Sequence, residues 1–322
     1  MSKNILVTGI GGNVGQGILR NILKLNMDIK IIGTDMRLIS AGNHLCDRVY
    51  QVPFSASTEY IPNILRICNK EKINLIIPST DLETYYLALV RKKLPALACS
   101  DAKTAKIFLN KYETWINFKK FSIPFAPTFL SSEYNGEFDN VIVKPKEGVG
   151  SKNIYINPPT PKDFSDEFII QQLIKGKEIT TAFYVTKDKK LLGQITFLRA
   201  LMSGTTTICE VTFEYDNKVE KLIRKITNKF DIRGSCNIQS SINNKGEIIP
   251  FELNCRISGT NSIRSQFGFE DVRYTIEEYL LNKKPQRPII KKGSAVRILM
   301  DVIYPDIGLN RIKDKTTKHY IF

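Results

Sequence analysis

Residues 234–259 read GSCNIQSSINNKGEIIPFELNCRISG, a stretch that predicts a β-hairpin. Two β-compatible runs, CNIQSSI and EIIPFELN, flank the turn signal NNKG. Glu252 and Asn254 stand two residues apart and so point to one face of the second strand, while Gln239 lies late on the first strand. Oxygen ligands of this kind suit Mg²⁺, and the nearby Arg256 can bind a phosphate with two hydrogen bonds. On these residues alone, an exposed hairpin with ordinary polar side chains is the alternative.

The composition is that of a globular protein. The chain has 322 residues, enough for two or three structural units, with 42% apolar and 25% charged residues. No apolar run approaches the roughly 20 residues of a membrane span, and the N-terminus has no signal-peptide pattern. The six cysteines are scattered without CxxC spacing, which argues against a zinc site and against a secreted disulfide scaffold. We therefore expect a cytoplasmic protein.

The net charge of +15 raises the question of nucleic-acid binding. The lysines are spread along the whole chain, with no arginine-rich tract and no basic motif interleaved with aromatic residues. We therefore do not expect a nucleic-acid partner. A basic surface also attracts phosphorylated or carboxylated small molecules.

The N-terminal residues follow the Rossmann order of strand, glycine turn, helix, strand and acid. The run NILVTG leads into GxGGxxG, formed by glycines 9, 11, 12 and 15, and the next strand ends at Asp35. One interpretation is NAD(P) binding, with Asp35 on a ribose. The other is a βαβ unit whose glycines permit a tight turn, and the missing YxxxK pair of short-chain dehydrogenases favours it. Further strand and helix patterns complete a doubly wound domain over residues 1–101.

The central residues predict a glycine-rich flap and a hinge. The strand VIVKP places Lys144 at its end, and the loop KEGVGS then leads back into the strand KNIYI. Backbone N–H groups of such a loop can cradle phosphates, although an ordinary hairpin is the alternative. The strand FIIQQ and a strand from Glu178 flank a short polar break. An edge of this kind can contact an adenine ring, and Glu178 can accept hydrogen bonds from ribose hydroxyls.

This order of parts resembles the ATP-grasp superfamily, and more narrowly the stand-alone proteins similar to the carbamoyl phosphate synthase large subunit. The resemblance covers residues 3–282. It implies an α/β and α+β protein, in which an N-terminal Rossmann-like parallel sheet precedes a two-lobed ATP-grasp domain. The expected boundaries are residues 1–101 for the Rossmann-like domain, 102–180 for the small lobe with its flap, and 181–322 for the large lobe with the metal site and a C-terminal tail.

The resemblance also implies a set of nucleotide contacts. Two lysines bind the ATP phosphates, and Lys144 takes part in catalysis. The implied contacts are Lys111 and Lys144 on the phosphates, Gly148, Gly150 and Ser151 in the flap, Gln171, Gln172 and Ile174 at the adenine, and Glu178 at the ribose.

The metal and substrate contacts follow in the same way. Gln239, Glu252 and Asn254 would hold one or two Mg²⁺ ions, with Mn²⁺ as a substitute. Arg256 would contact the γ-phosphate or the acyl phosphate formed from it. Arg199 and Arg264 would contact substrate, and Asp81 and Glu83 would face the interface of the N-terminal domain or bind the amine.

Three residues depart from the family pattern. Gln171 replaces a hinge glutamate, Gln239 replaces the commoner acidic ligand, and Cys255 stands where proline is usual. The first weakens the adenine contact, and the second removes one negative charge from the metal site.

The resulting hypothesis is an ATP- and Mg²⁺-dependent ligase that joins a small-molecule carboxylate to an amine through an acyl phosphate. Two alternatives stay open, an NAD(P)-dependent oxidoreductase that uses GxGGxxG and a non-catalytic ATP-binding module. The sequence predicts no membrane partner and leaves a homodimer open.

Overall fold

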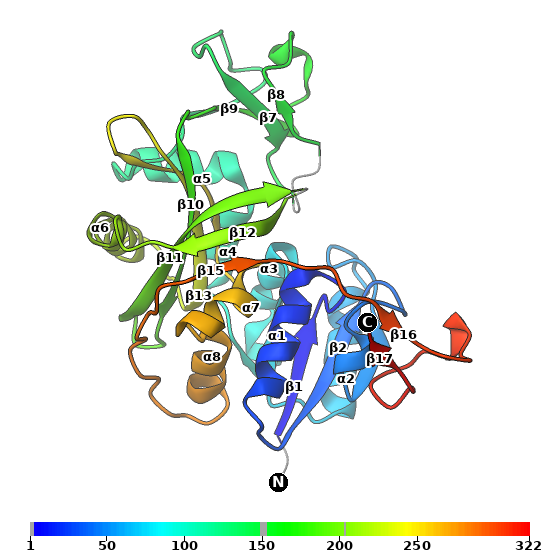
Figure 1. Ribbon diagram of the computed structural model, residues 1–322. Coiled ribbons are helices and arrows are strands. Elements are labelled where there is room, and N and C mark those ends of the chain that lie inside the picture. Colours follow the sequence, from blue (N-terminus) through cyan, green and yellow to red (C-terminus); the bar gives the residue numbers. More distant parts are fainter. Residues whose placement is uncertain (1–2, 149–152, 203) are drawn as a thin grey trace.

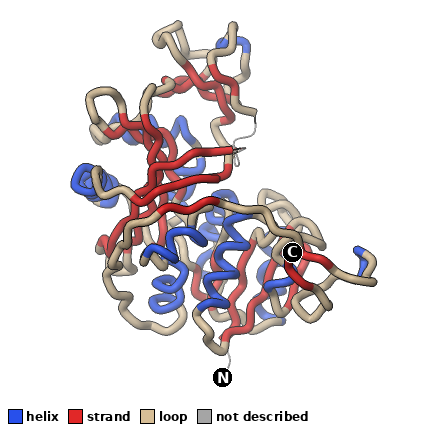
Figure 2. The backbone as a smooth tube through the Cα atoms, in the orientation of Figure 1, coloured by secondary structure: helices blue, strands red, loops and turns tan. Residues whose placement is uncertain are grey.

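The computed structural model describes residues 3–148, 153–202 and 204–322. The described residues form four β-sheets: a parallel sheet at the N-terminus, a small antiparallel sheet, a larger antiparallel sheet, and a two-stranded sheet near the C-terminus (Figures 1 and 2). None of the helices in the described ranges is long and apolar enough to cross a membrane.

The N-terminal domain is a five-stranded parallel sheet in the order β3-β2-β1-β4-β5. Helix α1 packs on one face, while α2 and α3 pack on the other. The expectation of a Rossmann-like sheet is confirmed. Its elements are β1 Lys3–Thr8, α1 Asn13–Lys24, β2 Ile29–Asp35, β3 Arg48–Gln51, α2 Tyr60–Lys70, β4 Leu75–Ile77, α3 Asp81–Leu89 and β5 Ala96–Leu97.

The glycines of the first turn serve close packing. A Cβ on Gly15 would lie 2.4 Å from the carbonyl oxygen of Gly9, so a side chain there would push helix α1 off the turn. Gly9 itself has a φ of +59°, a left-handed conformation that favours glycine. The GxGGxxG pattern therefore has a structural reason in the βαβ unit.

The small sheet has the order β6-β9-β7-β8 and antiparallel pairing. Its core consists of Tyr134, Val141, Val143 and Ile170, with four phenylalanines packed against them. In Figure 1 this sheet projects away from the rest of the chain. Its strands are β6 Thr128–Leu130, β7 Val141–Pro145, β8 Tyr155–Ile156 and β9 Phe168–Gln172.

The larger sheet has the order β14-β13-β10-β11-β12-β15, again with antiparallel pairing. Helices α4, α5 and α6 cover one face. The other face packs against residues around α8. The elements are α4 Ala102–Leu109, α5 Lys111–Lys120, β10 Lys177–Val185, β11 Leu191–Met202, β12 Thr205–Val211, α6 Asp216–Thr227, β13 Gly234–Ile242, β14 Ile248–Asn254, α7 Asn261–Arg264, α8 Asp271–Tyr279 and β15 Ser294–Val296.

The described structure divides the lobes differently from the expected boundaries. Phe108 of α4 and Phe118 of α5 share a core with Phe230, which follows α6, and with Cys236 of β13, so these helices pack with the large lobe. Strand β10 begins at Lys177 and pairs with β11 and β13, so the expected boundary at residue 180 falls inside a strand. The reason is packing: the apolar faces of α4 and α5 are buried against the larger sheet.

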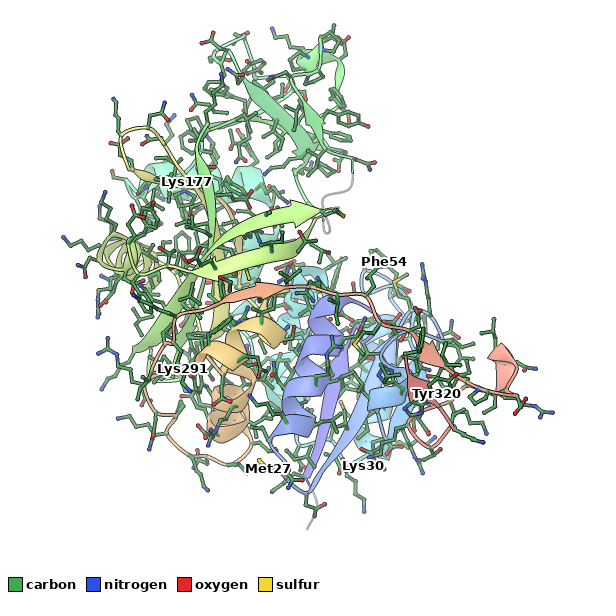
Figure 3. All side chains as sticks on the ribbon, viewed as in Figure 1. Met27, Lys30, Phe54, Lys177, Lys291 and Tyr320 are labelled. Atoms are coloured by element: carbon green, nitrogen blue, oxygen red, sulfur yellow. The ribbon has the colours of Figure 1, made fainter. Side chains whose placement is uncertain are left out.

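The C-terminal residues return to the N-terminal domain. After β15 the chain crosses in front of α1 (Figure 1) and forms the hairpin of β16 Val302–Ile303 and β17 Tyr320–Ile321. The amide N–H of Lys315 donates to the carbonyl oxygen of Cys46 over 2.9 Å, and its Nζ lies 2.6 Å from Asp47. Figure 3 labels Lys177, the first residue of β10, and Lys291, which precedes β15 of the same sheet.

Candidate nucleotide and metal site

The predicted hairpin forms, and it brings the three predicted metal ligands together. Gln239 of β13 stands opposite Glu252 of β14, next to a register shift at Pro250. The Asn254 Nδ2 donates to Glu252 Oε1 over 3.2 Å, and the Gln239 Nε2 donates to Asn254 Oδ1 over 3.3 Å. The described residues contain no cluster of three His, Cys, Asp or Glu side chains. One carboxylate and two amide oxygens therefore make up this donor set, which suits a hard cation that keeps several water ligands.

Two buried lysines face this carboxylate. Lys111 is the first residue of α5 and Lys144 lies on β7, with exposures of 6% and 5%. Burial lowers the pKa of Lys144 to about 8, with Glu252 opposing and Lys111 adding to the shift. Although burial alone raises the pKa of Glu252, Lys111 and Lys144 bring it below its ordinary value. Within the described ranges neither lysine has a carboxylate within 4 Å. Lys111, Lys144 and Glu252 together therefore carry a net positive charge that a bound anion can neutralise.

The local chain explains why the lysines meet. The Asn110 side chain accepts from the N–H groups of Tyr112 and Glu113 and so caps α5. The N–H of Lys111 donates to the carbonyl oxygen of Lys146 over 2.9 Å, and Asn110 forms a β-bridge with Glu147. The helix start is thereby tied to the end of β7.

The flap can be followed only in part. A Cβ on Gly148 would lie 3.4 Å from the Cβ of Pro145, an ordinary van der Waals contact. The predicted flap residues Gly150 and Ser151 lie outside the described residues.

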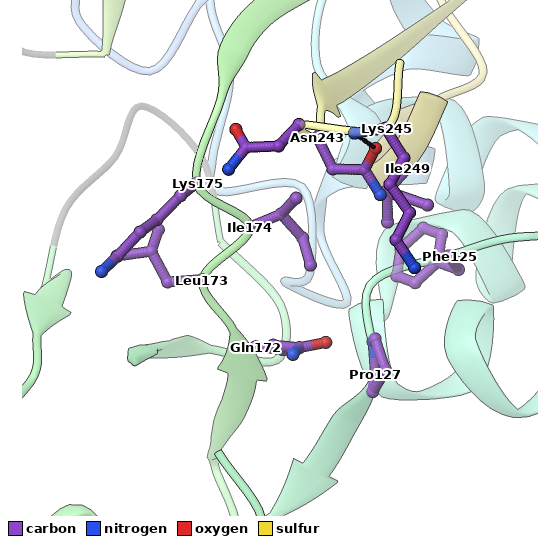
Figure 4. Close-up of a pocket in the computed structure, with 10 residues that line it drawn as sticks. Phe125, Pro127, Gln172, Leu173, Ile174, Lys175, Asn243, Lys245 and Ile249 are labelled. Atoms are coloured by element: carbon purple, nitrogen blue, oxygen red, sulfur yellow. Dashed lines mark hydrogen bonds between the residues drawn. The ribbon is translucent and has the colours of Figure 1, made fainter. Parts of the chain in front are cut away.

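The predicted adenine contacts lie beside a cavity of about 540 Å³. Figure 4 shows Gln172 and Ile174 on one side of it and the turn after β13 on the other. The N–H of Gln172 already donates to the carbonyl oxygen of Pro127 over 2.9 Å. The full lining is Phe125, Pro127, Gln172, Leu173, Ile174, Lys175, Asn243, Asn244, Lys245 and Ile249. This volume lies within the range of small-molecule pockets.

Gln171 is turned into the protein. Its side chain is 1% exposed, and its Nε2 donates to Thr128 Oγ1 over 2.9 Å and to the carbonyl oxygen of Phe251 over 3.4 Å. The amide nitrogen is thus used in joining the two sheets. The side-chain oxygen is the group of Gln171 that can accept from an adenine amine.

The predicted ribose contact, Glu178, is paired with Arg199. The Arg199 Nε donates to Glu178 Oε1 over 2.9 Å, and its Nη2 donates to both Glu178 and Gln239. Glu178 stands opposite Ser241, which stands opposite Ile249 of the cavity wall. Arg199 therefore lies between the predicted ribose contact Glu178 and the predicted metal ligand Gln239.

Arg256 contacts the N-terminal domain. Its Nη2 lies 2.6 Å from Asp81 Oδ2, and the two side chains are 12% and 8% exposed. Asp81 thus faces the domain interface, as expected. Glu83 does not, because it is buried and accepts hydrogen bonds from Thr8, Thr80 and Tyr60.

The assignment of Arg264 to substrate binding is wrong. Its side chain is 0% exposed and is paired with Asp271, which is equally buried. Its Nη1 donates to Ser258 Oγ over 2.8 Å and to Thr260 Oγ1 over 2.9 Å. The guanidinium holds together the turn after β14 and the start of α8, and it offers no free face to a ligand.

The sequence indicated most of the candidate residues, but it did not indicate which side chains they contact. The contacts of Arg199 with Glu178 and Gln239 join strands that are 21 and 40 residues apart. The cavity wall from Asn243 to Lys245 coincides with the turn signal NNKG, which predicted the hairpin but carried no sign of a ligand.

Comparisons with known proteins agree with this architecture. Residues 5–100 match the PylC-like N-terminal domain, and residues 108–260 match the ATP-grasp domain. The search of curated proteins gave no match.

Solved structures of low sequence identity share the fold. N5-carboxyaminoimidazole synthetase from Staphylococcus aureus, complexed with ADP, has a TM-score of 0.77 at 12% identity, covering 93% of this chain and 83% of its own. N5-carboxyaminoimidazole ribonucleotide synthetase from Thermotoga maritima has a TM-score of 0.69 at 14% identity, covering 94% of this chain and 84% of its own. The biotin carboxylase domain of the Hydrogenobacter thermophilus 2-oxoglutarate carboxylase, with MgADP and bicarbonate, has a TM-score of 0.71 at 15% identity, covering 91% and 73%.

The two domain matches and the arrangement of the sheets lead to one conclusion: the chain carries an ATP-grasp domain after a PylC-like N-terminal domain.

Proposed function

We propose that the protein is an ATP- and Mg²⁺-dependent ligase that joins a small-molecule carboxylate to an amine. The observation that carries the proposal is the placement of buried Lys111 and Lys144 against Glu252, which stands in register with Gln239. Among the described residues these two buried cations have no carboxylate within ion-pair distance, which favours a polyanion as ligand, and the oxygen ligands beside them favour a bound cation. Mg·ATP supplies both.

Gln239, Glu252 and Asn254 are the residues that would hold one or two Mg²⁺ ions, or Mn²⁺ in their place. A metal held by these residues would supply positive charge to the transferring phosphoryl group. Lys111 and Lys144 bind the phosphates, while the cavity beside Gln172 and Ile174 takes the adenine. Glu178 accepts from the ribose hydroxyls in exchange for part of its pairing with Arg199.

The chemistry has two steps. The substrate carboxylate attacks the γ-phosphorus, forming a new O–P bond and releasing ADP. The amine nitrogen then attacks the carbonyl carbon of the acyl phosphate, loses a proton and expels phosphate. Arg256 and Lys144 stabilise the charge on the transferred group, so positioning and electrostatics carry the catalysis.

The nicotinamide alternative has less support. The Asp35 carboxylate accepts from the N–H of Gly11 over 2.7 Å and from the N–H of Arg37 over 3.0 Å. Both of its oxygens therefore stabilise the local turns, and neither is reserved for a ribose.

Two measurements test the proposal. Mg·ATP should raise the melting temperature, and NAD(P) should not; the opposite result favours an oxidoreductase. ADP formation should then be measured across carboxylate–amine pairs, with Glu252→Ala as the inactive control. Nucleotide binding with no ADP formation above that control on any pair would identify a non-catalytic ATP-binding module.

The partners and compartment belong to the same proposal. We expect small-molecule substrates. The homodimer that the sequence leaves open can be tested by light scattering on the purified chain. All six cysteines are free and buried, which supports a reducing compartment such as the cytoplasm.

A further inference from the structure

The contact between Asp81 and Arg256 joins the N-terminal domain to the phosphate side of the site. Asp81 is the first residue of α3, just after β4, and Arg256 follows β14. Arg256 Nε and Nη2 lie 3.0 Å and 2.6 Å from the same oxygen, Asp81 Oδ2. Because both side chains are nearly buried, water screens this charge-assisted pair little.

The hydrogen-bond inventory of Arg256 leaves room for a ligand. A guanidinium has five N–H groups. One on Nε and one on Nη2 go to Asp81, and one on Nη1 goes to the carbonyl oxygen of Ile257 over 3.2 Å. Among the described residues, one N–H on Nη1 and one on Nη2 have no acceptor. Two donors on neighbouring nitrogens form the fork that binds phosphate oxygens in pairs.

The same carboxylate oxygen also reaches a predicted metal ligand. Asn254 Nδ2 donates to Asp81 Oδ2 over 3.4 Å and to Glu252 Oε1 over 3.2 Å. With both donors of this amide directed at carboxylates, Asn254 Oδ1 is directed away from them, where it accepts from Gln239. Asp81 therefore influences the orientation of two side chains of the site.

We propose that Asp81 is a positioning residue for phosphoryl transfer. It holds the guanidinium of Arg256 and the amide of Asn254 in the orientation that serves the γ-phosphate and the metal. A preorganised cation needs no reorganisation when charge develops on the transferred group, whereas a freely rotating arginine does. This inference rests on the proposed function.

Steady-state kinetics of ADP formation from Mg·ATP test it. Asp81→Asn should lower kcat about 10- to 100-fold, the order of magnitude expected for a misplaced group, with little change in KM for ATP. Asp81→Glu should recover part of the rate, because it restores the charge. If Asp81 acts through Arg256, the double variant Asp81→Asn with Arg256→Lys should be no slower than Arg256→Lys alone.

Glu270→Gln is a matched control. Glu270 directly precedes α8, and its Oε1 lies 3.9 Å from the Nζ of Lys24 on α1. It therefore also bridges the N-terminal domain and the α8 region, but at the surface. The Glu270→Gln variant should form ADP with the kcat of the wild type. A wild-type kcat in Asp81→Asn, with only a lowered melting temperature, would reduce the pair to a structural bridge. A raised kcat would show that Asp81 restrains Arg256 unproductively, and either result overturns the proposal.

A second readout does not depend on turnover. The Nε–Hε NMR signal of Arg256, identified by its loss in Arg256→Lys, should shift and broaden in Asp81→Asn. If the wild type forms no ADP on any substrate pair, the proposed function fails, and this signal still decides whether Asp81 holds the guanidinium. An unchanged signal would overturn the inference alone.

Discussion

Replacing Lys144 by Met should stabilise the ligand-free protein while abolishing its response to Mg·ATP. Lys144 is 5% exposed, and its pKa falls from the ordinary 10.5 to about 8, chiefly through burial. That fall corresponds to a cost of roughly 3 kcal/mol for keeping the charged lysine in the folded state. Because Glu252 loses a neighbouring cation in the variant, we expect a smaller net gain of about 1–2 kcal/mol at pH 7.

The pH dependence of the free energy of unfolding shows whether the charged Lys144 destabilises the folded protein. Between about pH 8 and 10.5 the folded protein binds fewer protons at Lys144 than the unfolded chain does. The wild type therefore gains stability as pH rises through this window, and the variant lacks this contribution. The advantage of Lys144→Met should be full below pH 8 and should disappear near pH 10.5.

Urea denaturation at pH 7 and pH 10.5, with and without Mg·ATP, measures both effects. Lys146→Met is the control, because Lys146 lies on the same segment but pairs at the surface with Glu167. At pH 7 Mg·ATP should stabilise the wild type and Lys146→Met, and leave Lys144→Met unchanged. A Lys144→Met variant less stable than the wild type at pH 7, or an advantage that persists at pH 10.5, would refute the reasoning.

Three further substitutions probe the rest of the site. Glu252→Ala should abolish Mg·ATP-dependent ADP formation without unfolding the protein, and unchanged turnover would contradict the metal assignment. Gln239→Glu adds a second carboxylate, so the Mg²⁺ concentration for half-maximal ADP formation should fall several-fold; a rise would count against Gln239 as a ligand. Arg264→Met should cost about 3–5 kcal/mol in urea denaturation, because it leaves Asp271 buried without its partner. A loss of activity with unchanged stability would instead restore Arg264 as a substrate contact.

Much of the fold followed from local patterns. The hairpin of β13 and β14 was predictable because a turn signal and a two-residue period depend on neighbouring residues alone. The same period placed Glu252 and Asn254 on one face, and the structure adds Gln239 opposite Glu252. The glycines of the first turn were predictable as packing residues for the same reason, and the structure adds that a Cβ on Gly15 would clash with the backbone of Gly9.

The lobe boundary could not be predicted in this way. Helices α4 and α5 follow the N-terminal domain and precede the small sheet, so chain order assigns them to the small lobe. Their apolar residues Phe108 and Phe118 instead pack with Phe230, more than a hundred residues further along. Burial of apolar area decides such a placement, and sequence distance has no part in it.

The sequence by itself determined which residue types form the candidate site: a lysine at the end of a strand, and Gln239, Glu252 and Asn254 on a hairpin. The tertiary structure alone decided what each arginine does. Arg256 pairs with Asp81, 175 residues away, whereas Arg264 is buried against Asp271 and leaves the candidate site. The physical reason is that the role of an arginine depends on which carboxylate it pairs with and on how far its guanidinium is buried from water. Both depend on how the sheets and the N-terminal domain dock.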